Sequence, residues 1–256
     1  MKSFDLIIRN GCICDGTGNP SRHADVGIVG DRIEAIGKLS DATAKETVDA
    51  SGKVVAPGFI DMHNHVDHAV LAFPDEESYI MQGVTTSVVG NCGLSMAPVS
   101  DAHRDEVRKY LKPFLDKKFD YGWEWSTLTE FFTRVRNSGT IQNLAPLVGQ
   151  GTLRIAVKGF DPSPATDAEM ARMKALLREE LEQGAFGLSS GLIYPPGSFT
   201  TERELTELAS VLTPFGAVYA THIRNEGDRL IESVDEAIAI GEANGIPVEI
   251  SHHKAA

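Results

Sequence analysis

Two histidines separated by one residue form the sharpest chemical feature of the sequence. They stand in the segment PGFIDMHNH at 57–65, which is predicted to begin as a strand. Residues two apart on a strand point to the same side, so Asp61, His63 and His65 are predicted to project from one face at its carboxyl end. Two imidazoles placed in this way can bind a divalent metal, with Asp61 available to orient one of the rings.

Cys92 is the second candidate ligand, in the segment VVGNCG at 88–93. It follows another predicted strand, and a thiolate there can ligate zinc while Gly90 and Gly93 let the backbone bend closely around an ion. A lone cysteine is more often a small core residue. Cys12 and Cys14 have no comparable setting and are predicted to be ordinary structural residues.

The histidines are not scattered along the chain. Five of the eight fall at carboxyl ends of predicted strands: His63, His65, His222, His252 and His253. The other three lie in predicted loops and are expected on the surface: His23, His68 and His103. A cysteine with histidines from two other strands supplies three protein ligands, the number typical of catalytic zinc, which keeps a fourth position for water. The pattern therefore predicts a zinc site.

Strands and amphipathic helices that alternate after Gly52 are predicted to position these residues. Such alternation produces parallel sheets with right-handed crossovers. Thr166 and Glu169 match a capping box at the start of one helix, and Gly184 stands where its C-cap belongs. The six predicted strands are 54–61, 84–90, 143–149, 185–192, 217–223 and 246–251.

The fold class predicted from this alternation is a TIM-like (β/α)8 barrel of which about six strands are present, over residues 54–256. Residues 1–53 instead contain short strands, with a hairpin around Gly30-Asp31, and are predicted to form a separate small β unit. Six strands do not close a barrel that needs eight, and the sequence ends directly after a strand. We therefore expect an amino-terminal fragment of a longer protein.

Charge and composition exclude several classes of partner. The net charge of −12 opposes attraction to phosphate backbones and anionic membranes, so nucleic acid is not an expected partner. No run of about 18 apolar residues occurs, so no membrane span is expected. The first ten residues contain only a very short apolar stretch flanked by charges, so no signal peptide is expected. An odd number of cysteines, three, suits a reducing compartment, and the predicted location is the cytoplasm. The sequence does not indicate an oligomeric state.

Five segments together carry a family resemblance: Val55–His65, GNCG at 90–93, SSGLIYPPG at 189–197, THIR at 221–224 and SHHK at 251–254. In this order and spacing they resemble the N-acyl-D-amino-acid deacylases, or D-aminoacylases, of the amidohydrolase superfamily. Many members of that superfamily bridge two metals with a carboxylated lysine on the fourth strand. The corresponding strand here, Ala185–Leu192, contains no lysine, which favours the subgroup with a cysteine ligand.

The resemblance implies roles for particular residues. It places a tightly bound zinc at Cys92, His222 and His252. It places a second, weaker metal position at His63 and His65, which shares Cys92. It also places three residues around the substrate: Tyr194, Arg224 and Lys254. The catalytic aspartate of the family is expected beyond Ala256, and residues 1–53 are expected to belong to a small β-sandwich domain.

The function predicted for the complete enzyme is zinc-dependent hydrolysis of a C–N amide bond, with small N-acyl-D-amino acids as substrates. Either Lys254 or Arg224 is a candidate partner for the substrate carboxylate, although Arg224 equally suits an ion pair with Glu226 or Asp228 at the rim. Two alternatives remain open. One is a cyclic-amide hydrolase of dihydroorotase or hydantoinase type, and the other is a catalytically inactive metal-binding fragment.

Overall fold

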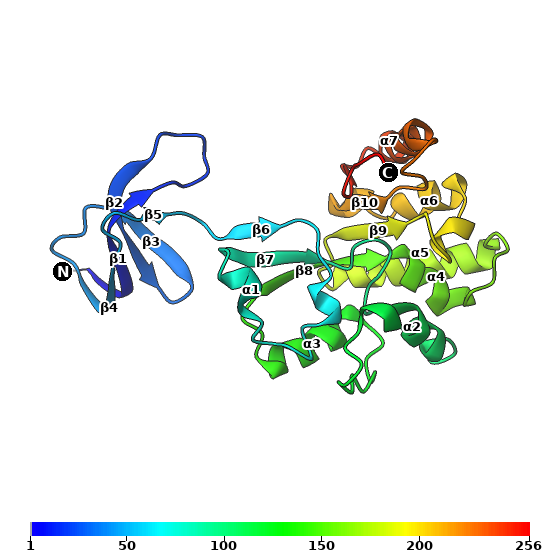
Figure 1. Cartoon of the computed structure of the whole chain (residues 1–256), viewed down its shortest axis with the longest axis horizontal. Helices are drawn as coiled ribbons and strands as arrows, with labels where there is room; N and C mark the ends of the chain where they lie inside the picture. The colour runs from blue at the N-terminus through cyan, green and yellow to red at the C-terminus, as the bar shows by residue number, and fades with distance from the viewer. Residues whose placement is uncertain (1) are drawn as a thin grey trace. The chain divides into compact units, whose positions relative to one another are not determined.

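The computed structural model describes residues 2–256, which form two compact units (Figure 1). The first unit extends to Gly58 and the second runs from Phe59 to Ala256. Pro57 and Gly58 are the last residues of the first unit, and a proline has no N–H with which to continue a strand ladder. The strand predicted over 54–61 is therefore two short strands, one in each unit.

The first unit is a five-stranded sheet in the order β3-β2-β1-β4, with β5 also paired to β1. Its strands are β1 (Ser3–Ile13), β2 (Arg22–Val29), β3 (Arg32–Gly37), β4 (Thr43–Asp49) and β5 (Val54–Val55). The hairpin predicted around Gly30 joins β2 to β3, and Gly30 has the positive φ that this turn requires. Phe4 packs so closely on Gly27 that a Cβ there would lie 2.5 Å from its ring.

The second unit contains a six-stranded sheet in strict chain order from β6 to β11, and every neighbouring pair is parallel. The strands are β6 (Phe59–Asp61), β7 (Val84–Val89), β8 (Asn143–Gly149), β9 (Gly187–Gly191), β10 (Val218–His222) and β11 (Val248–Ile250). This strand order is that of a (β/α)8 barrel, so the predicted barrel is confirmed in part.

Helices connect the strands of the second unit. They are α1 (Glu77–Ile80), α2 (Arg104–Leu111), α3 (Leu128–Ser138), α4 (Gln150–Lys158), α5 (Asp167–Glu182), α6 (Glu202–Ala209) and α7 (Leu230–Asn244), with short 3-10 turns at Val66–His68, Lys112–Phe114, Gly197–Phe199 and Thr213–Phe215. Neighbouring helices pack side by side, α4 on α5, α5 on α6 and α6 on α7. The capping box predicted at Thr166 and Glu169 is present in α5.

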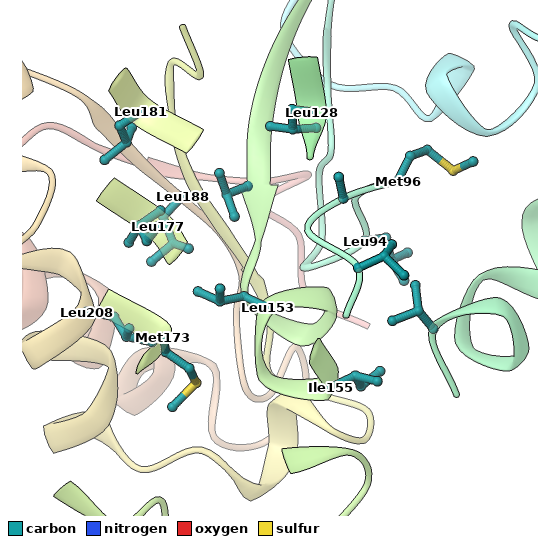
Figure 2. Close-up of a cluster of buried hydrophobic side chains, with 14 of the residues drawn as sticks. Leu94, Met96, Leu128, Leu153, Ile155, Met173, Leu177, Leu181, Leu188 and Leu208 are labelled. Atoms are coloured by element: carbon teal, nitrogen blue, oxygen red, sulfur yellow. The ribbon is translucent and has the colours of Figure 1, made fainter. Parts of the chain in front are cut away.

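The main core of the second unit lies between the sheet and these helices. Figure 2 shows Leu153 of α4, Leu177 of α5, Leu188 of β9 and Leu208 of α6 in one cluster of buried side chains, and all four are fully buried. This packing fixes the strands and therefore the positions of the side chains at their carboxyl ends. None of the helices within residues 2–256 has the length and apolar composition needed to cross a membrane.

Candidate metal centre

The carboxyl ends of four parallel strands bring the predicted ligands together. His63 and His65 follow β6, Cys92 follows β7, His222 is the last residue of β10, and His252 follows β11. Parallel strands end at one edge of a sheet, so residues far apart in the sequence converge there. We refer to these five side chains as the ligand cluster.

A tight turn holds Cys92 at this edge. Cys92 itself has a φ of 55°, and Gly90 and Gly93 on either side also have positive φ. A Cβ at Gly90 would lie 2.1 Å from the carbonyl oxygen of Leu147, so only glycine fits at that position. The hydroxyl of Ser189 on β9 accepts from the amide of Gly93 and donates to the carbonyl oxygen of Gly90, which ties the turn to the sheet.

The first group of candidate ligands is Cys92, His222 and His252, whose ligand atoms all lie within 4.8 Å of one another. The Sγ of Cys92 is 3.6 Å from Nε2 of His252. The rings of His222 and His252 meet edge to face, with their centroids 4.3 Å apart. One thiol and two imidazoles therefore surround a single point.

The second group is His63, His65 and Cys92, again with all ligand atoms within 4.8 Å. Nε2 of His63 lies 3.3 Å from the Sγ of Cys92, and the rings of His63 and His65 are 5.5 Å apart. Cys92 thus stands between the two groups and belongs to both.

Burial determines the protonation of the cluster. It lowers the pKa of His65 and of His222 to about 4, and it raises the pKa of the Cys92 thiol to about 12. The two imidazoles are therefore neutral at pH 7, which is the form that ligates metals. A divalent cation would favour the thiolate at Cys92, because a metal ion is the largest local charge in such a site.

The donor set fits zinc. Sulfur and imidazole nitrogen are the ligands that zinc prefers, and three of them with room for water make a typical catalytic site. Several buried ring nitrogens also have no hydrogen-bond partner in residues 2–256: Nδ1 of His63, Nδ1 of His65 and Nε2 of His222. Buried polar atoms are normally partnered, and a metal would supply a partner to such nitrogens where they face the cluster. At His63 the nitrogen beside Cys92 is Nε2, not the unpartnered Nδ1.

Asp61 does not orient a ring, contrary to the prediction. Its Oδ1 accepts from the backbone amide of His63, and its Oδ2 accepts from the side chain of Asn64. The carboxylate therefore shapes the turn after β6.

The three predicted substrate residues have different surroundings. Tyr194 donates its hydroxyl to the carbonyl oxygen of Cys92, and its ring lies 5.5 Å from that of His222. Lys254 lies beside the cluster, with Nζ 3.3 Å from Nδ1 of His252. The guanidinium of Arg224 is held by Glu236, at 2.7 and 3.0 Å, and by backbone carbonyls. The partner of Arg224 is therefore neither of the two acidic residues considered from the sequence.

His68 was predicted on the surface, but it is 1% exposed. The 3-10 turn at Val66–His68 carries its side chain inward, where its ring lies 5.6 Å from that of His65. With Asp67 and His65 it forms a third group of possible ligand atoms within 4.8 Å. Of the other histidines predicted on the surface, His23 is exposed, whereas His103 is half-buried and contacts Glu106.

Glu226 is the residue near the cluster whose importance the sequence did not reveal. Its side chain is 11% exposed, and its Oε1 lies 2.6 Å from Nζ of Lys254 and 3.0 Å from Nδ1 of His252. It follows β10 by four residues, in the segment HIRNE. This position just after a strand end is the sequence feature that could have marked Glu226 as part of the site.

Comparison with known proteins gives the chain close relatives. It is 43% identical over 251 residues to the D-aminoacylase of Alcaligenes xylosoxydans xylosoxydans, a match that covers 98% of this chain and 51% of the relative. A crystal structure of D-aminoacylase superposes with a TM-score of 0.87 at 40% identity, over 98% of this chain and 52% of that chain. The chain therefore spans about half the length of the relatives it matches.

A second solved structure is similar to the chain over the same length. The N-acyl-D-glutamate deacylase of Bordetella bronchiseptica, complexed with zinc and a phosphonate inhibitor, gives a TM-score of 0.88 at 38% identity, over 98% of this chain and 52% of that chain. The resemblance found from the sequence motifs is thus confirmed. A family model described as "Amidohydrolase family" matches residues 46–256. The chain belongs to the amidohydrolase family.

Proposed function

We propose that the protein hydrolyses the amide bond of N-acyl-D-amino acids with a zinc ion held by Cys92, His222 and His252. The observation that carries the proposal is the convergence of these three donors, from three different strand ends, within 4.8 Å. The names of the relatives, a D-aminoacylase and an N-acyl-D-glutamate deacylase, supply the substrate class.

Two further assignments accompany this proposal. His63 and His65 form a second, weaker metal position through the shared Cys92, which is supported by their grouping within 4.8 Å. The boundary predicted between residues 53 and 54 falls inside the first unit, because β5 pairs with β1 there. We therefore assign the chain through Gly58 to a small β-sandwich domain and residues 59–256 to the hydrolase barrel. The five-stranded sheet of the first unit supports one layer of this sandwich.

Cys92, His222 and His252 would hold the zinc, which when bound would supply a hydroxide nucleophile near neutral pH and polarise the amide carbonyl. Lys254 binds the substrate carboxylate, because its half-exposed ammonium lies beside the cluster and has three donors, of which Glu226 engages one. Arg224 is less suited to that role, since Glu236 already binds its guanidinium bidentately. The ring of Tyr194 forms one wall of the site. Asp61 does not serve as the general acid, because both of its oxygens accept local hydrogen bonds.

The direct test compares substrates on the zinc-loaded protein. Release of acetate from N-acetyl-D-amino acids and from their L-enantiomers is measured beside ring opening of hydantoins. We expect deacylation of the D-enantiomers, dependence on zinc, and loss of turnover in Cys92→Ala. Cys14→Ala is the matched control, since Cys14 lies in the first unit and is exposed.

Two outcomes would reject the proposal in favour of the alternatives. Ring opening of hydantoins without deacylation would indicate a cyclic-amide hydrolase. One equivalent of bound zinc without turnover of any of these substrates would indicate a catalytically inactive metal-binding protein.

A further inference from the structure

We propose that Glu226 is a positioning residue that selects the tautomer of His252 able to bind metal. The inference rests on the proposed metal site, of which His252 is one ligand. Nε2 of His252 is the ring nitrogen that faces the cluster, 3.6 Å from the Sγ of Cys92. A neutral imidazole carries one proton on one of its two nitrogens, so Nε2 can ligate only when the proton is on Nδ1.

Two groups with opposite requirements lie next to Nδ1 of His252. Oε1 of Glu226 is 3.0 Å away and, as a carboxylate oxygen, can only accept a hydrogen bond. Nζ of Lys254 is 3.3 Å away and, as an ammonium, can only donate one. Glu226 therefore favours the tautomer that leaves Nε2 free, whereas Lys254 favours the tautomer that places a proton on Nε2 and blocks ligation.

Glu226 also restrains this competitor. Its Oε1 accepts a hydrogen bond from Nζ of Lys254 at 2.6 Å, which is shorter than the distance from Nζ to His252. Charge-assisted hydrogen bonds are stronger than bonds to a neutral acceptor, so the ammonium is held mainly by the carboxylate. One oxygen thus accepts from the ring of His252 and anchors the lysine, and it also lies 3.6 Å from Nε2 of His222.

The surroundings keep the carboxylate in place. The side chain of Glu226 is 11% exposed, and its backbone oxygen accepts from the amide of Ala256, so the segment after β11 is joined to the segment after β10. The amides of Gly227 and Arg229 donate to the side chain of Asn225, which fixes the turn that carries Glu226. Outer-shell partners of this kind orient a ligating histidine and set its tautomer.

The experiment reads the tautomer directly. Long-range proton–nitrogen NMR spectra of the metal-free chain distinguish a His252 protonated on Nδ1 from one protonated on Nε2, and zinc affinity is measured separately by competition with a chromophoric chelator. The variants are Glu226→Leu, Glu226→Gln and the double variant Glu226→Leu with Lys254→Met. Glu232→Leu, an exposed glutamate in the first turn of α7, is the matched control.

We expect His252 to be protonated on Nδ1 in the wild-type chain and on Nε2 in Glu226→Leu. Zinc affinity should fall about 10- to 100-fold in Glu226→Leu, the usual cost of losing an outer-shell partner, and less in Glu226→Gln, whose amide oxygen still accepts. Removing the competing donor with Lys254→Met should restore much of the affinity lost in Glu226→Leu. A purely structural role for Glu226 does not predict this recovery.

The same tautomer in the wild-type chain and in Glu226→Leu would overturn the inference, as would an unchanged zinc affinity or a double variant as weak as Glu226→Leu. The resonances of the other histidines report whether each variant is folded. The tautomer measurement needs neither zinc nor turnover, so its result is independent of whether the protein proves to be a deacylase.

Discussion

Two buried polar regions of the second unit differ in how completely their atoms are partnered. The first, the Arg154 network, consists of Arg154, Lys158 and Glu204. Arg154 is fully buried, yet its two terminal nitrogens contact Glu204 and the carbonyl oxygens of Asp161 and Ser163, and Nε is left without a partner. Lys158 likewise donates to backbone oxygens and to carboxylates nearby. The positive charges of Arg154 and Lys158 are therefore paired with carboxylates and with backbone carbonyl oxygens.

The second region is the ligand cluster, where ring nitrogens of His63, His65 and His222 are buried without partners among residues 2–256. Leaving a buried polar group unsatisfied costs about 1–3 kcal/mol. Most of this cost is absent from the Arg154 network, where the polar groups have partners, and is present at the strand ends, where the ring nitrogens have none. Burial of polar groups alone therefore does not indicate function, whereas burial without partners, on groups that can ligate a metal, does.

The largest effect is expected from breaking the partnered region. Arg154→Met would leave the 5% exposed Glu204 without its cation, and removal of one member of a buried pair costs about 3–5 kcal/mol of unfolding free energy. Urea unfolding monitored by circular dichroism measures the loss. Arg203→Met is the matched control, because Arg203 is 83% exposed and its ion pair with Glu207 contributes little. Equal stability of the two variants would contradict the comparison.

Breaking the unpartnered region should reduce metal binding and leave the fold intact. Cys92→Ser removes the side chain common to both ligand groups, so we expect zinc affinity to fall at least about 100-fold, or about 3 kcal/mol. Competition with a chelator measures the affinity. Cys14→Ser should bind zinc as the wild type does, and a Cys92→Ser chain that did the same would remove Cys92 from the site.

The ligand cluster could be predicted largely from the sequence, because strand ends are recognisable and parallel strands end at one edge. His63, Cys92, His222 and His252 each follow or end an apolar run, and this rule alone places them together. The capping box of Thr166 and Glu169 was equally local, since these two residues of a four-residue segment are enough to specify it.

Features that depend on long-range packing could not be predicted in the same way. His68 follows a polar segment typical of loops, and only the inward direction of the turn at Val66–His68 buries it. The partner of Arg224 is Glu236 because α7 begins at Leu230 and presents that carboxylate to the guanidinium. The role of Glu226 depends on the position of the segment after β11, which lies far along the chain.

Glu180 of α5 is an intermediate case that sharpens the comparison. It is 1% exposed and accepts from the backbone amide of Leu128, a neutral partner, and burial raises its pKa from 4.5 to about 7. The folded state therefore holds this proton more tightly than the unfolded state does. Its contribution to stability is complete below pH 4.5 and is lost as the pH rises to 7.

Glu180→Gln removes this titration. We expect the variant to be about 3 kcal/mol more stable than the wild type at pH 8, with the advantage shrinking as the pH falls toward 5. Urea unfolding at a series of pH values measures the difference. Glu182→Gln, at an exposed position of the same helix, should show no such trend. A stability difference independent of pH would mean that Glu180 is not the titrating group.

The smallest effect has the opposite sign from the first. Both ring nitrogens of His68 are buried without partners, while its ring packs against Phe114. His68→Leu introduces an apolar side chain of similar size and removes the unsatisfied nitrogens. The unfolding free energy of the metal-free chain should therefore rise by about 1 kcal/mol. His103→Leu, in which the ring contacts Glu106, should gain nothing. A loss of stability in His68→Leu would show that His68 is partnered in solution. His68 would then not belong with the unpartnered groups of the ligand cluster.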